Sequence, residues 1–158
     1  MLIQFNNLIL SFFMAMNTAT ANPPVVIETL DNIKELSCLS QAIHGEASNQ
    51  GLDGKLAVAH VIVNRSKSPK FPSDICSVVR QKYQFKFITK QKWINVDKPG
   101  VTRQMTEAVM AANMVLNEGV KDNTRGALYF INPKTYTDRS WLQHRKLTIK
   151  IQDHAFYS

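Results

Sequence analysis

One carboxylate, Glu46, stands where the helical pattern of its segment calls for an apolar side chain. Leu36, Leu39 and Ile43 recur at helical spacing, and Glu46 is the next position on their stripe. An ionised carboxylate is costly in apolar surroundings unless it is paired, so the pattern predicts a raised pKa for Glu46. A carboxyl that keeps its proton near neutral pH can act as a general acid. The alternative is a glutamate of the last helical turn that reaches solvent.

The segments on either side of Glu46 must hold it in place. The domain proper should begin near Glu28, and Thr29 or Asp31 should cap its first helix, which ends near Glu46, before the polar stretch 48–51. A second helix is expected after Gly51, and its residues 56–63 are apolar almost all the way round. That pattern predicts a buried central helix. His60 is the one polar residue in this apolar stretch. It could be a ligand or a base, but we expect a hydrogen-bonded core residue.

The rest of the chain predicts an α+β domain. We expect a short helix capped by Ser73 or Asp74, a strand or hairpin arm at Tyr83–Thr89, a turn at Pro99–Gly100, a helix from Thr102 that stops at Gly119, and strands at Gly126–Ile131, Lys146–Ile151 and Ala155–Tyr157.

Several motifs in the chain fit one known pattern. Residues 42–47 have the form A-x-x-x-E-A, residues 54–65 read G-x-x-A-V-A-x-V-x-x-N-R, and residues 68–72 form a loop with two prolines. The pair Gln84-Phe85 and the closing residues 153–157 also match. From about Leu36 to the C-terminus, the sequence therefore resembles the cell wall hydrolase family that includes the catalytic domain of the spore cortex-lytic enzymes.

The resemblance implies a lysozyme-like fold and cleavage of the muramoyl–glucosamine bond in peptidoglycan glycan strands, with Glu46 as the acid. Many glycosidases use a second carboxylate. Six aspartates could supply this second carboxylate, but each is better explained as a cap, a turn residue or a surface charge: Asp53, Asp74, Asp97, Asp122, Asp138 and Asp153. A one-acid site suits a lytic transglycosylase, which leaves 1,6-anhydromuramoyl ends. A muramidase-type hydrolase and a non-catalytic cell-wall-binding module remain the alternatives.

Four other residues are candidates for substrate binding. The resemblance points to Gln84 and Phe85, which would lie on opposite faces of a strand, so at least one of them should be structural. Tyr129 and His154 could line the cleft or support its wall. Hydrogen bonds to nearby loops are a sufficient explanation for Asn64 and Arg65. Packing in the wall of the cleft explains Trp93 and Trp141 as well as stacking on sugars would.

Other classes of function fit the sequence less well. His44-Gly45-Glu46 is a lone H-x-E without a downstream Pro-Cys-x-x-Cys, so we expect neither a zinc site nor another cofactor. The net charge of +7 attracts polyanions, but the positive residues are scattered along the chain, which argues against a nucleic-acid partner.

Residues 1–21 have the outline of a secretory signal peptide, with an apolar run at 8–16 and Ala19-Thr20-Ala21 before Asn22. The alternatives are a first core helix and an uncleaved anchor. We expect residues 22–158 to form a single, monomeric domain, exported to the periplasm or to the cell wall and medium, with no stable membrane insertion once the signal is removed. In an exported chain, Cys38 and Cys76 permit one disulfide, and two buried thiols are the alternative.

Overall fold

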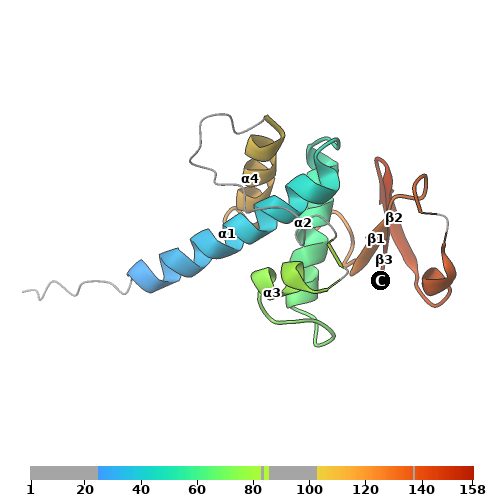
Figure 1. Ribbon diagram of the computed structural model, residues 1–158, viewed down its shortest axis with the longest axis horizontal. Helices are drawn as coiled ribbons and strands as arrows, with labels where there is room; N and C mark the ends of the chain where they lie inside the picture. Colours follow the sequence, from blue (N-terminus) through green and yellow to red (C-terminus); the bar gives the residue numbers. More distant parts are fainter. Residues whose placement is uncertain (1–24, 83, 86–102, 137) are drawn as a thin grey trace, which may run out of the picture.

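The computed structural model describes residues 25–82, 84–85, 103–136 and 138–158, in which four α-helices pack beside a small antiparallel sheet (Figure 1). The helices are α1 (Val25–Ala47), α2 (Leu52–Ser66), α3 (Ile75–Arg80) and α4 (Arg103–Leu116). The strands are β1 (Tyr129–Ile131), β2 (Leu147–Ile151) and β3 (His154–Tyr157), and a short 3-10 helix, η1 (Ser140–Leu142), lies between β1 and β2. The expected α+β class is confirmed.

Helix α2 is the centre of the fold. All its residues from Gly54 to Ile62 are buried, and it contacts α1, α3, α4 and the sheet. His60 is 5% exposed, and burial lowers its pKa although Asp122 opposes the shift. His60 is therefore a neutral core residue, as its place on an apolar helix predicts, but its Nε2 has no hydrogen-bond partner among the described residues.

Helix α1 carries the expected apolar stripe into the core, where Leu39, Ile43 and Ala47 are fully buried. A disulfide between Cys38 and Cys76 joins α1 to α3, so the two cysteines are bridged and are not free thiols. The start of α1 differs from the prediction, because the helix already runs from Val25. Thr29 and Asp31 thus lie inside α1 and not at its start, whereas Asp74 caps α3 as expected by accepting a hydrogen bond from the Ser77 N–H.

The sheet has the order β1-β3-β2, with antiparallel pairing throughout. Phe156 of β3 packs with Ala57 and Val61 of α2, which fixes the sheet against the central helix. Strand β1 is shorter than predicted: it begins at Tyr129, and the predicted first residue, Gly126, lies with Arg125 in a turn in which both have positive φ. Helix α4 ends as expected, with Gly119 at φ 66°.

Some predictions fall outside the described residues: the signal peptide at 1–21, Trp93, Asp97, the turn at Pro99–Gly100, and most of the strand at Tyr83–Thr89. Within that predicted strand, Gln84 lies in a turn and donates its N–H to the carbonyl of Gln81. Across the part of the chain that is described, no helix combines the length and hydropathy needed to cross a bilayer.

Candidate active site

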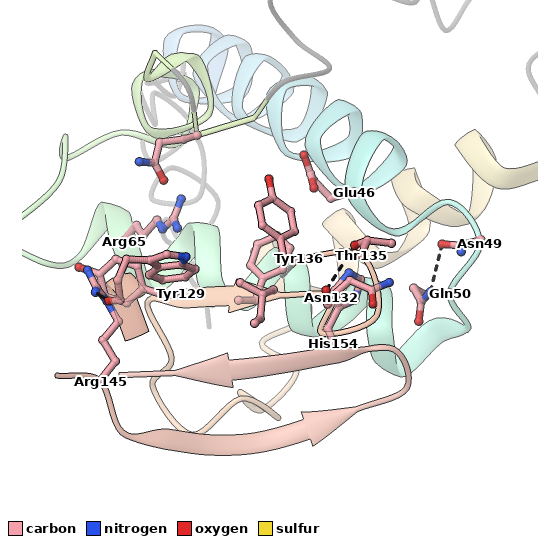
Figure 2. A pocket seen from close by; sticks show the side chains of 14 residues that line it. Glu46, Asn49, Gln50, Arg65, Tyr129, Asn132, Thr135, Tyr136, Arg145 and His154 are labelled. Carbon is pink, nitrogen blue, oxygen red and sulfur yellow. Dashed lines mark hydrogen bonds between the residues drawn. The ribbon is translucent and has the colours of Figure 1, made fainter. Parts of the chain in front are cut away.

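A pocket of about 470 Å³ opens between the helices and the sheet (Figure 2). It is bounded by the C-terminal ends of α1 and α2, by β1 and the segment that follows it, and by the start of β3. Its lining consists of Glu46, Asn49, Gln50, Arg65, Gln84, Tyr129, Phe130, Ile131, Asn132, Thr135, Tyr136, Trp141, Arg145 and His154.

Glu46 enters the pocket from the last turn of α1. Its neighbours on the apolar stripe, Ile43 and Ala47, are fully buried, and they anchor the end of the helix in the core. Glu46 itself is half-buried. Among the described residues that line the pocket it is the only carboxylate, so the geometry offers one carboxyl group for proton transfer.

The loop after Glu46 is held from the helical side by Lys55, which is 1% exposed. Its ammonium group donates to the carbonyl oxygens of Gln50 and Ser48 and forms an ion pair with Glu107 of α4 at 3.2 Å. Because the charge is paired and hydrogen-bonded, a lysine can occupy this buried position. Lys55 thereby fixes the backbone that presents Asn49 and Gln50 to the pocket.

The same loop is held from the sheet side by the turn between β2 and β3. The side chain of Gln50 donates to Asp153 at 3.1 Å and accepts from the Asp153 N–H, while the Gly51 N–H donates to Gln152. This close approach needs a glycine at position 54, where a Cβ would lie 2.5 Å from Gln152 and 2.8 Å from the Cβ of Gln50. Hydrogen bonds and close packing therefore join the loop after α1 to the β2–β3 turn at this side of the pocket.

Arg65 is the buried cation of the pocket. It is 4% exposed, and its Nε donates to the carbonyl oxygen of Leu128 at 2.7 Å. Burial lowers its pKa to about 10, with Tyr129 and Glu46 opposing the shift, so the guanidinium stays charged at neutral pH. Glu46 therefore faces a nearby positive charge as well as apolar neighbours, which the stripe on α1 did not predict.

Aromatic rings surround Arg65 and a second arginine, Arg145. The Arg65 guanidinium lies 5.1 Å from the ring centroid of Phe71 and 5.8 Å from that of Tyr129. Arg145 lies 4.0 Å from the Tyr129 centroid and 5.0 Å from that of Trp141. Cation–π contacts of this kind fix the orientation of both guanidinium groups. Figure 2 shows Arg65, Tyr129 and Arg145 together at one side of the pocket, with Asn49 and Gln50 at the other.

His154 lies at the start of β3, with its ring 5.3 Å from that of Phe130. Burial lowers its pKa, although the neighbouring Asp153 opposes the shift, so the imidazole is neutral at neutral pH. Its Nδ1 is buried and, among the described residues, has no hydrogen-bond partner. His154 is therefore a neutral polar side chain in the lining of the pocket.

The structure brings four of the five predicted residues together, because Glu46, Gln84, Tyr129 and His154 all line the pocket. Phe85 does not line it. Phe85 is 2% exposed and belongs to the main core, with its ring 5.5 Å from the Arg65 guanidinium. Its position is thus that of a support beneath Arg65.

Sequence reasoning assigned no binding role to several lining residues: Asn49, Gln50, Arg65, Asn132, Thr135, Tyr136 and Arg145. Arg65 could have been found, since it follows Val58 and Ile62 at helical spacing and is a charge on an apolar stripe, as Glu46 is. Asn64, by contrast, binds loops as expected, through Asp122 and the carbonyl of Ala127. Among the described residues, no group of three or more His, Cys, Asp or Glu side chains could hold a metal ion.

Two solved structures share this arrangement of helices and sheet. They are the catalytic domain of the germination-specific lytic transglycosylase SleB from Bacillus anthracis and that of the Bacillus cereus SleB protein. Both have a TM-score of 0.64 and 28% identity, and the matches cover 78% and 80% of this chain and 93% and 91% of theirs. The expected lysozyme-like fold is confirmed.

The chain belongs to the Cell Wall Hydrolase family, whose sequence profile matches residues 49–157. Spore cortex-lytic enzymes of Bacillus subtilis (strain 168) and Halalkalibacterium halodurans are 29% and 28% identical over 128 and 122 residues, which is 77% of this chain in both cases. The chain spans 37% and 34% of the length of these two relatives. Glu46 precedes the residues that the family profile matches, so its assignment depends on its place in the pocket.

Proposed function

We propose that this protein cleaves the bond between muramoyl and glucosamine units of peptidoglycan glycan strands, with Glu46 as the general acid and base. The observation that carries the proposal is the position of Glu46 in the pocket, where it is the only carboxylate among the described lining residues. Membership of the Cell Wall Hydrolase family and the likeness to a lytic transglycosylase domain support the substrate.

The proposed reaction needs one carboxyl group. Glu46 donates its proton to the glycosidic oxygen as the C1–O bond of the muramoyl unit breaks, and the glucosamine unit leaves as an alcohol. The ionised Glu46 then accepts the proton of the muramoyl 6-hydroxyl as its oxygen bonds to C1. The product carries a 1,6-anhydro ring, no water is consumed, and Glu46 ends in its starting protonation state.

The surroundings of Glu46 support this cycle. The positive charge of Arg65 stabilises the carboxylate that exists between the two proton transfers. Tyr129 and Trp141 also line the pocket, and Arg145 lies over both rings, so these rings hold a second positive charge at the site. We propose that Gln84 and His154 hydrogen-bond the substrate, and that Phe85 contributes by supporting Arg65.

The mass of the reaction product tests the proposal. We expect purified protein to release glycan fragments with 1,6-anhydromuramoyl ends from peptidoglycan. Fragments heavier by one water would identify a muramidase-type hydrolase instead. Binding to the wall without any release of fragments would identify a non-catalytic wall-binding module.

The place of action follows from the substrate, because peptidoglycan lies outside the cytoplasmic membrane. We propose an exported, monomeric protein whose residues 1–21 are removed. The N-terminal sequence and the sedimentation mass of the exported protein test these two points, and a chain that still begins at Met1 would contradict the first.

A further inference from the structure

We propose that the arginine side of the pocket, formed by Arg65, Tyr129 and Arg145, binds a carboxylate carried by the glycan substrate. This inference rests on the proposed function and adds the chemical group that the cleft selects. It follows from the hydrogen-bonding state of Arg65, the orientation of Arg145, and the balance of charge in the pocket.

Arg65 lines the pocket and has a donor nitrogen that makes no hydrogen bond to any described residue. The residue is 4% exposed, and one N–H is bonded to the carbonyl of Leu128. Its Nη1 is buried and, within the described part of the chain, has no hydrogen-bond partner. Leaving a buried cationic donor unpaired costs free energy, so this nitrogen favours a ligand that brings an acceptor.

Arg145 presents a second guanidinium that is held in place before any ligand arrives. It stacks on Tyr129 with 4.0 Å to the ring centroid, and its Nη1 donates to the carbonyl of Trp141. A guanidinium has more N–H donors than this one bond uses. Such a planar group, held over a ring, matches the two oxygens of a carboxylate.

The charges of the pocket also favour an anion. Among the described lining residues, the two arginines face a single carboxylate, Glu46, and burial keeps His154 neutral. When Glu46 carries the proton that it must donate, both guanidinium charges lack an anion among those residues. A neutral sugar cannot supply one, whereas a substrate carboxylate can.

Peptidoglycan offers this group in two chemical forms. The lactyl ether of the muramoyl unit has a carboxyl group that is either free or amide-linked to a peptide, and the peptide has carboxylates of its own. Figure 2 shows the arginine side displaced from Glu46 in the direction opposite to Asn49 and Gln50. We infer that the glycan runs along the pocket with the cleaved bond at Glu46 and a substrate carboxylate at the arginine side.

The test uses muramoyl–glucosamine oligosaccharides of one length in three forms: with a free lactyl carboxylate, with a neutral lactyl carboxamide, and with a peptide that has free carboxylates. For the wild type we expect kcat/KM on one of the two carboxylate forms to exceed that on the carboxamide roughly tenfold or more, the usual scale for a hydrogen bond to a charged group. The preferred form identifies the source of the carboxylate. In Arg145→Gln this ratio should fall close to one, and Arg145→Lys should restore part of it.

Arg139→Gln is the matched control, since Arg139 is exposed and does not line the pocket. It should keep the wild-type ratio. Equal kcat/KM values on all three forms, or an unchanged ratio in Arg145→Gln, would overturn the carboxylate site while the cleavage of the carboxamide form still supports the proposed function. If the wild type cleaves none of the three, the proposed function fails. Calorimetric binding of the same oligosaccharides then decides the carboxylate site separately, and equal affinities would overturn it.

Discussion

Different interactions stabilise the two walls of the pocket. The helical wall is formed by the C-terminal ends of α1 and α2, and the sheet wall by β1, the segment that follows it and the start of β3. The helical wall places Glu46 by burying apolar side chains and by the Cys38–Cys76 bridge. The sheet wall places its polar and charged groups by hydrogen bonds and ring contacts around Tyr129 and His154. On the proposed function, the helical wall positions the proton donor and Arg65 of α2, while the sheet wall adds Tyr129 and His154 to the ligand site.

Truncation of an apolar side chain should lower the free energy of unfolding more in the helical wall than in the sheet wall. Leu39 of α1 is fully buried, so Leu39→Ala should lower the free energy of unfolding by about 2–5 kcal/mol. Ile149 of β2 is half-buried, so Ile149→Ala should cost only roughly 1 kcal/mol. Urea unfolding followed by circular dichroism measures both changes, and equal losses would contradict the difference between the walls.

Reduction of the disulfide should also act through the helical wall. The bond closes a loop between residues 38 positions apart, so its removal should lower the free energy of unfolding by about 2–4 kcal/mol. Denaturation of Cys38→Ala/Cys76→Ala beside the oxidised wild type gives this difference, and reductant should have no effect on the variant. A wild type whose stability does not change on reduction would contradict the prediction.

The sequence predicted the helical wall far better than the sheet wall, for a physical reason. Helical spacing alone revealed the apolar stripe that ends at Glu46 and the burial of α2, because the side chains on one face of a helix recur every three to four residues along the sequence. In the sheet wall, Tyr129 and His154 lie on strands, but Asn132, Tyr136 and Arg145 come from turns and loop segments, where no periodic pattern marks a lining residue. Their meeting with Glu46 depends on how the sheet packs on α2 through Phe156, which is a tertiary contact.

Acid pH should weaken the fold through the two buried histidines. Burial lowers the pKa of both His60 and His154 below the ordinary value of 6.5. The unfolded chain therefore binds more protons as the pH falls through 6.5, so stability is full above that pH and is lost below it. We expect the unfolding free energy to decline between pH 6.5 and pH 5, and His60→Asn or His154→Asn to flatten the decline. A stability that stays level or rises over this range in the wild type would contradict the prediction.

The smallest effect is expected at the rim of the sheet wall. Lys134 pairs with Asp153 at 2.8 Å, but its side chain is 79% exposed. Ion pairs in water contribute little, so Lys134→Gln should leave the denaturation midpoint within experimental error. Asp153 would still accept the hydrogen bond from Gln50. A clear loss of stability in Lys134→Gln would show that the turn depends on charge more than the geometry indicates.

The central claim, that Glu46 is the proton donor, is tested most directly by Glu46→Gln on peptidoglycan, with Glu35→Gln as a control on the same helix. The amide keeps the shape of the side chain but cannot donate a proton to the leaving oxygen. We predict a loss of cleavage of about a hundredfold or more in Glu46→Gln, with wall binding and the unfolding midpoint retained, and near wild-type cleavage in Glu35→Gln. Cleavage by Glu46→Gln within a few-fold of the wild type would contradict the account.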